Sequence, residues 1–240
     1  MTNSIDFPLV DLVSAPESTL KTIYVACRTC YSEQYPNDIW NEEVDEAKML
    51  KLLSKVMSSG HHSTLEHCQY VFAVSGISRA CSHQLVRHRH MSFSQKSQRY
   101  VTEISQFEYI TPPSIEKSEF IDEYNNFMTE IQVFYTKMIN AGIKAEDARF
   151  ILPNATNTSM ILSLNLREFI HVSELRLCAN AQHEIRKLVQ KMVNLAVKKD
   201  PWLKDYLVPK CVNIGYCNEF KSCGMYPAKK EGLETYARNA

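Results

Sequence analysis

Residues 87–100 read RHRHMSFSQKSQRY. The first thirteen of them include three arginines, two histidines and one lysine, with no acidic side chain among them. Because cations this close repel one another, we expect the segment to bind an anion. We expect a helix over residues 75–90, which places Gln84, Arg87 and His88 within one turn near its end. Residues 92–99 should then form a loop in which backbone N–H groups, the Ser97 hydroxyl and the Arg99 guanidinium hold a phosphate.

Two other interpretations of this segment are weaker. A nucleic-acid interface would interleave the cations with exposed aromatic side chains, and only Phe93 and Tyr100 qualify. The chain has 27 basic and 27 acidic residues, so its zero net charge provides no overall field to attract nucleic acid or an anionic membrane. If the segment were only a solvated part of the surface, its positive charges would repel one another without a partner of opposite charge. The segment therefore favours a bound anion, with no nucleic-acid or membrane partner.

Glycine is scarce in this chain, and its placement excludes two common nucleotide sites. The six glycines are too far apart for either G-x-G-x-x-G or G-x-x-x-x-G-K to be written anywhere. If the protein binds nucleotides, it must hold their phosphates with arginine, serine and backbone donors outside those two motifs.

Apolar periodicity predicts several long helices and few strands. Gly60 is expected to end one helix, and the Pro112-Pro113 pair is expected to end a strand. Strands and helices do not alternate regularly, so we expect an α+β protein. The predicted helices are 45–57, 75–90, 120–138, 165–175 and 181–197, and the predicted strands are 68–74 and 107–110.

One apolar stripe in the helix predicted at 120–138 has several possible roles. It could be a cofactor contact or a subunit interface, but a buried core face is the simplest interpretation. The stripe comprises Phe120, Tyr124, Phe127, Ile131, Phe134 and Met138.

No linker or repeat divides the chain, so we expect one catalytic domain over residues 1–200 and a cysteine-containing extension over 201–240 packed on it. No apolar run is long enough to span a membrane, and the N-terminal MTNSIDFPLV does not resemble a signal peptide. We therefore expect a cytoplasmic protein. Five of the eight cysteines lie mostly among apolar neighbours and are expected to act as small buried hydrophobes: Cys27, Cys30, Cys68, Cys81 and Cys178.

Two further groups of residues raise the question of a metal. Six of the eight histidines lie between His61 and His90, yet H-E-x-x-H is absent, and His61 or His67 capping a helix or packing in the core is the simpler alternative. In the extension, Cys211, Cys217 and Cys223 lack a clear fourth zinc ligand. A structural or surface role is therefore favoured for them, and we expect no metal site.

Several motifs are similar to those of the flavin-dependent thymidylate synthases, and together they extend over roughly residues 20–190. The most specific is R-H-R followed by seven residues and Ser, which fixes four identities at rigid spacing. The matching segments are A-C-R-x-C-Y-S at 26–32, G-H-x-S-x-L-E-H at 60–67, R-H-R-x7-S-Q-R-Y at 87–100, D-A-R-x-x-L-P at 147–153, N-x-R-E at 165–168, L-R at 175–176 and A-Q-x-E-I-R at 181–186.

The resemblance implies a reaction, a fold and an assembly. Members of this family methylate C5 of the uracil of dUMP with the one-carbon unit of methylenetetrahydrofolate, use FAD reduced by NADPH, and release dTMP and tetrahydrofolate. Their fold implies long helices packed on a small, mostly antiparallel sheet. The family also implies a homotetramer with active sites between subunits. A flavin- or nucleotide-binding regulatory protein without turnover is the alternative.

The matching positions carry the family's site residues over to this chain. Arg176 is the expected catalytic residue, because a guanidinium beside the pyrimidine N3 and carbonyls would stabilise negative charge as C5 becomes nucleophilic. Ser97 is the rival, as a nucleophile, although no carboxylate in its own segment could act as its base. For FAD the implied contacts are Ser63, Arg87, His88, Arg89, Gln95, Asn165, Arg167 and His171. For dUMP they are Gln84, Arg87, Gln95, Lys96, Ser97, Gln98, Arg99, Arg149 and Arg176.

Three positions depart from the family pattern. Gln95 stands where Glu is common, which removes one charge from the site, and His183 replaces a Trp that would stack or pack. Ser94 stands where Asn is frequent.

Overall fold

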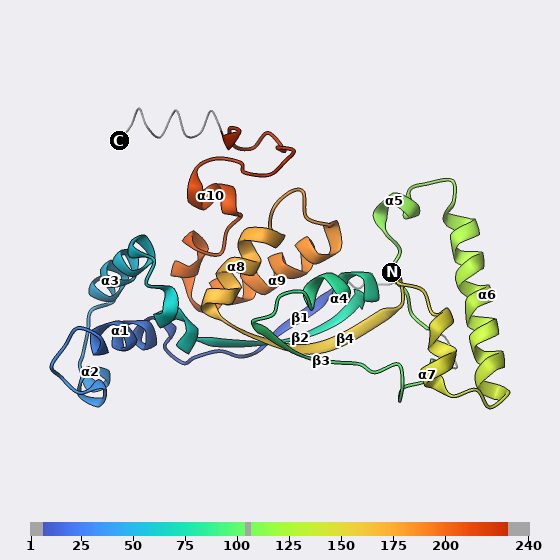
Figure 1. Ribbon diagram of the computed structural model, residues 1–240, viewed down its shortest axis with the longest axis horizontal. Coiled ribbons are helices and arrows are strands. Elements are labelled where there is room, and N and C mark those ends of the chain that lie inside the picture. Colours follow the sequence, from blue (N-terminus) through green and yellow to red (C-terminus); the bar gives the residue numbers. More distant parts are fainter. Residues whose placement is uncertain (1–6, 104–106, 230–240) are drawn as a thin grey trace, which may run out of the picture. The chain divides into compact units, whose positions relative to one another are not determined.

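The computed structural model describes residues 7–103 and 107–229 (Figure 1). The N-terminal six residues and residues 230–240 of the expected extension lie outside this range. In chain order the elements are β1 Leu9–Ser14, α1 Thr19–Thr29, α2 Pro36–Asn41, α3 Glu46–Ser59, η1 His62–His67, β2 Gln69–Ser78, α4 Arg79–Leu85, β3 Met91–Gln95, α5 Pro113–Glu116, α6 Ile121–Asn140, α7 Ala145–Ala148, η2 Arg149–Ile151, β4 Asn157–Asn165, α8 Leu166–Arg176, α9 His183–Lys199, η3 Pro201–Asp205 and α10 Lys210–Ile214.

The strands form a four-stranded antiparallel sheet in the order β1-β2-β4-β3. Its strand β4 was not predicted, although its residues alternate between buried and more exposed positions, with Thr158, Met160, Leu162 and Leu164 on the buried face. The expected α+β class and the small antiparallel sheet are both confirmed.

The described residues divide into two compact units. The first contains residues 7–9, 73–87, 93–103 and 107–161, and the second contains residues 10–72, 88–92 and 162–229. Residues 201–229 therefore belong to the second unit. The expected boundary at residue 200 remains a prediction.

In the second unit, helices pack against the ends of the strands that it contains. Phe169 of α8 lies edge-on to Tyr70 and Phe72 of β2, with ring centroids 5.7 and 5.6 Å apart. Helices α8 and α9 lie side by side (Figure 1). The apolar face predicted for α9 is buried, as its sequence periodicity indicated: Ile185, Leu188, Val189, Met192, Val193 and Ala196.

Capping residues explain where two predicted helices begin and end. Gly60 ends α3 in the left-handed conformation with φ 76°, which a residue without a β-carbon adopts at little cost. The Asn165 side chain accepts the Glu168 backbone N–H at 2.9 Å and so starts α8. The predictions for 45–57 and 165–175 are confirmed to within a few residues at each end.

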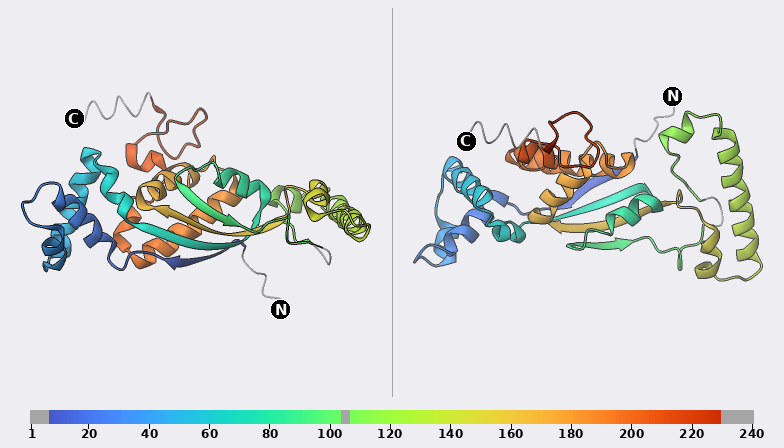
Figure 2. Two further views of the ribbon diagram at one scale, coloured as in Figure 1. Left: turned by 60° about the horizontal axis from the view of Figure 1, so that its bottom comes forward. Right: turned by 45° about the horizontal axis from the view of Figure 1, so that its top comes forward.

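In the first unit, α6 contacts α5, α7 and η2, and Figure 2 shows it as one long helix with α7 near its end. Gln132 of α6 accepts the Phe107 N–H at 2.6 Å and donates to the Glu103 carbonyl at 2.8 Å. One amide thus attaches α6 to the segment that follows β3.

The apolar stripe of α6 is not a buried core face within this chain, so that interpretation was wrong. Phe120, Phe127 and Phe134 are 58%, 53% and 50% exposed, and only Met128 and Tyr135 of this helix are buried. The exposed phenylalanines are spaced by seven residues, so they share one side of the helix.

The helix predicted over residues 75–90 is mostly wrong. Strand β2 continues to Ser78, passing through Gly76 at φ 75°, where a β-carbon would collide with the Phe7 ring. Helix α4 begins only at Arg79, capped by the Ser78 hydroxyl, which accepts the Cys81 N–H at 3.0 Å. It ends at Leu85, so the basic stretch follows the helix instead of extending it.

Two neighbouring expectations also need correction. Residues 92–95, expected to begin a loop, form strand β3 together with Met91. The strand predicted at 107–110 is reduced to a single antiparallel bridge between Tyr109 and Thr156.

The cysteines match the sequence prediction in part. Cys27, Cys68 and Cys81 are buried, whereas Cys30 is exposed and Cys178 is half-buried. Burial raises the pKa of the Cys68 thiol to about 12, as expected for an inert core cysteine. Within residues 7–103 and 107–229, no helix has the length and apolar character needed to cross a membrane.

Candidate functional site

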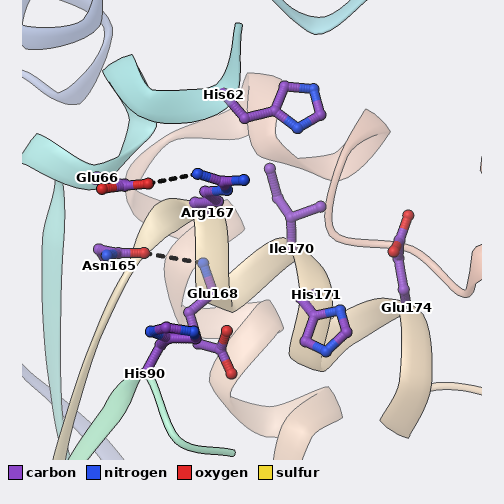
Figure 3. Close-up of a pocket in the computed structure, with 9 residues that line it drawn as sticks. All are labelled: His62, Glu66, His90, Asn165, Arg167, Glu168, Ile170, His171 and Glu174. Atoms are coloured by element: carbon purple, nitrogen blue, oxygen red, sulfur yellow. Dashed lines mark hydrogen bonds and ion pairs between the residues drawn. The ribbon is translucent and has the colours of Figure 1, made fainter. Parts of the chain in front are cut away.

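The N-terminal half of α8 forms one wall of a polar pocket in the second unit (Figure 3). Three residues expected to contact FAD meet there, namely Asn165, Arg167 and His171. Several neighbours were not among the expected site residues. The pocket is lined by His62, Glu66, His90, Asn165, Arg167, Glu168, Ile170, His171 and Glu174.

An ion pair holds the guanidinium of this pocket. Arg167 Nη1 lies 2.6 Å from Glu66 Oε1, and both side chains are about half exposed. Glu66 belongs to η1, which packs against α8. The pair therefore links two elements that are 101 residues apart in sequence and fixes where Arg167 points (Figure 3).

Beside this pocket, a buried imidazole lies between a carboxylate and a guanidinium. His88 is 5% exposed and Glu168 is 6% exposed. His88 Nδ1 lies 3.5 Å from Glu168 Oε1, and Arg176 Nε donates to His88 Nε2 at 3.0 Å. Since Nε2 accepts a hydrogen bond, the single ring proton belongs on Nδ1, facing Glu168.

The electrostatics of this group favour a neutral imidazole. Burial, together with smaller effects of the charges of Arg176 and His171, lowers the pKa of His88 to about 4. Glu168 would act in the opposite direction, but its 3.5 Å contact does not outweigh burial. A neutral His88 can position Arg176 without repelling it.

Two other residues expected to contact FAD lie elsewhere in the second unit. Ser63 lines a different hollow, formed by α1, α3 and η1. Arg89 is exposed in the turn after His88. This arrangement does not bring Ser63 to the pocket of Asn165 and Arg167.

The residues expected to bind dUMP lie in the first unit, except Arg176. Gln84 is half-buried on α4 and Arg87 is exposed just beyond it. Gln95 ends β3, and its amide donates to the Thr158 hydroxyl at 3.2 Å. The Ser97 hydroxyl accepts the Arg99 N–H at 3.2 Å, which orders the turn after the strand.

Carboxylates outside the basic segment pair with these cations, which corrects the expectation that only an anionic ligand could compensate them. Arg99 donates through Nε and Nη2 to Glu146 Oε2, at 3.1 and 2.9 Å. Lys96 Nζ lies 2.6 Å from Glu103 Oε1. Both carboxylates lie outside residues 87–100, and Glu146 is 47 residues from Arg99.

Arg79 joins this cationic group and was missed by the sequence analysis. Its Nη2 donates to the Lys96 carbonyl at 2.7 Å, while its Nε is buried without a hydrogen-bond partner among the described residues. Burial lowers the pKa of Arg79, and the neighbouring charge of Arg149 lowers it further. Arg149 in turn donates to the Glu146 carbonyl at 3.1 Å. An anion near Arg79 and Arg149 would relieve both effects.

Some of the missed residues had a signal in the sequence. Glu66 and Glu168 both stand inside motifs that were used for the resemblance, at 60–67 and 165–168. Arg79 and Glu146 had none that distinguishes them from surface charges.

The histidine cluster serves several purposes. His61 and His67 are exposed, so neither packs in the core, and His61 makes no side-chain cap of η1. His62 contacts the Met57 carbonyl at 3.3 Å and lines the α8 pocket. Within the described ranges, no three His, Cys, Asp or Glu side chains form a ready metal-binding group.

Comparison with known proteins gives a consistent result. Residues 11–202 match the family model described as thymidylate synthase complementing protein. A flavin-dependent thymidylate synthase of Nitratidesulfovibrio vulgaris is 35% identical over 238 residues, covering 93% of this chain and 97% of the relative. The enzyme of that name from Pyrococcus furiosus is 39% identical over 220 residues, covering 88% and 89%.

Solved structures share the fold. Helicobacter pylori thymidylate synthase X, crystallised with FAD and dUMP, superimposes with a TM-score of 0.66 at 23% identity, covering 84% of this chain and 99% of that one. The UMP/dUMP methylase PolB of Streptomyces cacaoi, bound to 5-Br dUMP, gives a TM-score of 0.66 at 22% identity, covering 84% and 97%.

Proposed function

Because this chain belongs to the flavin-dependent thymidylate synthase family, we propose that it converts dUMP to dTMP. The carbon comes from methylenetetrahydrofolate, and NADPH supplies the reducing equivalents through FAD. The observation that carries the proposal is sequence identity of 35–39% with enzymes of this name over nearly their whole length. Turnover distinguishes it from a regulatory protein that only binds flavin and nucleotide.

FAD fits the donors of the second unit. When bound, it would supply the hydride that reduces the transferred carbon to a methyl group. The pocket on α8 offers the Arg167 guanidinium and the imidazoles of His62, His90 and His171, which suit a diphosphate, while Ile170 supplies an apolar contact. His88 and Arg89 lie in the same unit. The contacts of Ser63, Arg87 and Gln95 with FAD remain predictions from the resemblance.

The dUMP phosphate fits the cationic group of the first unit. Arg99, Lys96 and Arg149 would bind it, the orphaned Arg79 Nε adds a buried donor, and the Ser97 hydroxyl can donate. Gln84, Gln95 and Gln98 would provide amide contacts to the nucleotide. An arriving phosphate competes with Glu146 for Arg99, because the guanidinium already holds that carboxylate with two hydrogen bonds.

Arg176 is the proposed catalytic residue. Its Nε is held by the neutral His88, which sets the orientation of the guanidinium plane. A positive charge fixed against N3 and the carbonyl oxygens of the uracil would stabilise the negative charge that develops as C5 attacks the one-carbon unit. Glu168 would keep the His88 proton on Nδ1 and leave Nε2 to accept from Arg176.

The proposed assembly is a homotetramer with active sites between subunits. The phenylalanine stripe of α6 supports it, since apolar side chains of this size are commonly covered in an assembly. The eight free thiols suit a reducing compartment, so we place the reaction in the cytoplasm.

The test uses purified protein reconstituted with FAD. We expect flavin absorbance, NADPH oxidation that responds to dUMP, and formation of dTMP that requires methylenetetrahydrofolate. Flavin binding and NADPH oxidation without dTMP would establish the regulatory alternative. Protein unable to take up FAD would contradict both.

A further inference from the structure

Four cysteines from two distant parts of the sequence line one cavity in the second unit. One lies just after α8, one is on α10, and two lie on the segment that follows α10. We call them the C-terminal thiol cluster: Cys178, Cys211, Cys217 and Cys223.

Hydrogen bonds hold these segments together independently of the thiols. Asn213 of α10 donates to Glu174 of α8 at 2.9 Å, and Asn180 donates to the Lys221 carbonyl at 2.7 Å. Helices α8 and α10 are in contact, and Figure 2 follows the chain beyond α10 (red). The cluster is therefore assembled by the fold.

The chain turns sharply beside the thiols. Gly215, between Cys211 and Cys217, has φ 77°, and Gly224, directly after Cys223, has φ 85°. The Cys217 N–H donates to the Pro227 carbonyl at 2.7 Å, which closes the loop that carries Cys223. Two left-handed glycines thus let one short segment present three thiols on the same side.

The four thiols line the same cavity, which is also bounded by Pro209, Val212 and Tyr226. A cation placed among them would attract deprotonated sulfurs.

We propose that the four thiols of the C-terminal thiol cluster bind one structural zinc ion. Zn²⁺ favours four thiolates in a closed tetrahedral site, with Zn–S distances of about 2.3 Å. The sequence alone lacked a fourth ligand for the three cysteines of the extension, and Cys178 supplies it. Binding releases the thiol protons, and Lys210 and Arg186, which also line the cavity, offset part of the charge of the resulting tetrathiolate site.

The sulfurs must move inward when the ion binds. Among residues 7–103 and 107–229, no three candidate ligands already form a metal-binding group. Helix α10 has only five residues and Cys223 is exposed, so we expect these two parts to adjust when the ion binds. Metal binding would then be coupled to a local rearrangement of this segment.

The competing outcome is a pair of disulfides. All eight cysteines are free thiols in the structure. A reducing compartment would also disfavour disulfides.

The first experiment measures metal in the purified full-length protein, prepared under reducing conditions. We expect about one zinc per chain, as for a closed four-thiolate site. Cobalt substitution should give thiolate-to-metal charge-transfer absorption and the visible bands of a tetrahedral ion. Protein that contains no zinc and takes up neither zinc nor cobalt would overturn the proposal.

Serine variants identify the ligands. Replacing any cluster cysteine, for example Cys178→Ser or Cys217→Ser, should abolish stoichiometric zinc, whereas Cys30→Ser is the matched control because this exposed cysteine lies outside the cluster. A Cys178→Ser protein with full zinc and unchanged cobalt bands would refute the assignment of the fourth ligand.

Alkylation of the wild-type protein tests the same idea without any risk of misfolded variants. Zinc should protect four thiols from alkylation, and removal of zinc by a chelator should allow four additional alkyl groups, located by mass spectrometry at the cluster. Thiols that become reactive only after a reductant is added would indicate disulfides and overturn the proposal. Neither measurement depends on thymidylate formation.

Discussion

Arg176 Nε donates a hydrogen bond to Nε2 of the buried His88, across 88 residues of sequence. The contact connects the end of α8 with His88, which lies in the turn after α4. Arg176 and His88 both belong to the second unit. It keeps a guanidinium beside a neutral imidazole, which suits a residue whose charge must stay fixed while charge builds on a substrate.

Arg176→Ala should lower kcat by about 10²–10³-fold, the usual effect of removing one charge-stabilising donor. Flavin content should change little, because Arg176 does not line the α8 pocket. Lys198→Ala, an exposed cation on α9, serves as the control. Near-normal turnover by Arg176→Ala would exclude the catalytic role.

The free energy of unfolding should fall as pH decreases from about 6.5 to about 4. The folded-state pKa of His88 is lowered to about 4 from its ordinary 6.5. In this pH range the unfolded chain binds more protons at this position than the folded chain, so stability is complete above pH 6.5 and is lost on acidification. The contribution is at most about 3 kcal/mol.

Urea unfolding of the wild type and of His88→Gln at a series of pH values measures this contribution. The variant should be less stable at pH 7, and its stability should depend less on pH between 4 and 6.5. Equal pH dependence in the two proteins would show that His88 is not the group responsible.

Glu146→Gln should tighten dUMP binding by roughly two- to fivefold, because an exposed ion pair of this kind is worth up to about 1 kcal/mol. The change releases Arg99 from its carboxylate partner. Arg99→Ala should weaken binding by about tenfold or more. Calorimetric titration of flavin-loaded protein tests both, with Asp147→Asn as the neighbouring control. Weaker binding by Glu146→Gln would mean that Glu146 positions Arg99 instead of competing for it.

Gln95→Glu should leave dUMP affinity within about threefold of the wild type, whereas Gln95→Ala should lose about tenfold. The Thr158 hydroxyl now accepts from the Gln95 amide, and it can rotate to donate to a carboxylate. The same titration compares the variants. A large loss with Glu would indicate that the neutral amide is required in this chain.

Phe127→Asp combined with Phe134→Asp should produce a smaller assembly, because two charges would enter an apolar contact face. Thr129→Asp is the control, since Thr129 is exposed on another side of α6. Light scattering after gel filtration gives the mass of each. An unchanged mass for the double variant would show that this face of α6 does not form the subunit interface.

Long helices were the part of the fold most accessible to sequence analysis. Helices α3, α6, α8 and α9 have an apolar period near 3.6 and identifiable ends such as Gly60 and Asn165. The end of β2 was mistaken for the start of a helix because residues 75–78 form a short stretch of mixed character, and only their pairing in the sheet makes them a strand. Strand β4 had a readable alternation that was overlooked.

The candidate site also has a part that could be predicted from local sequence and a part that could not. Motif residues identified the arginines, histidines and amides, because rigid spacing within a segment is visible in sequence. Their partners came from contacts over long distances, as Glu146 does for Arg99 and Cys178 for the cysteines of the extension. Such contacts depend on the tertiary structure, and no local pattern encodes them.

The side-chain amide of Asn165 has two roles, one in the helix and one in the pocket. Its oxygen starts helix α8, while the same side chain lines the pocket proposed for the flavin. Replacement by aspartate keeps an oxygen acceptor for the helix and removes the amide donor, whereas replacement by alanine removes both. A comparison of the two substitutions therefore distinguishes the effect of Asn165 on the stability of α8 from its effect on flavin binding.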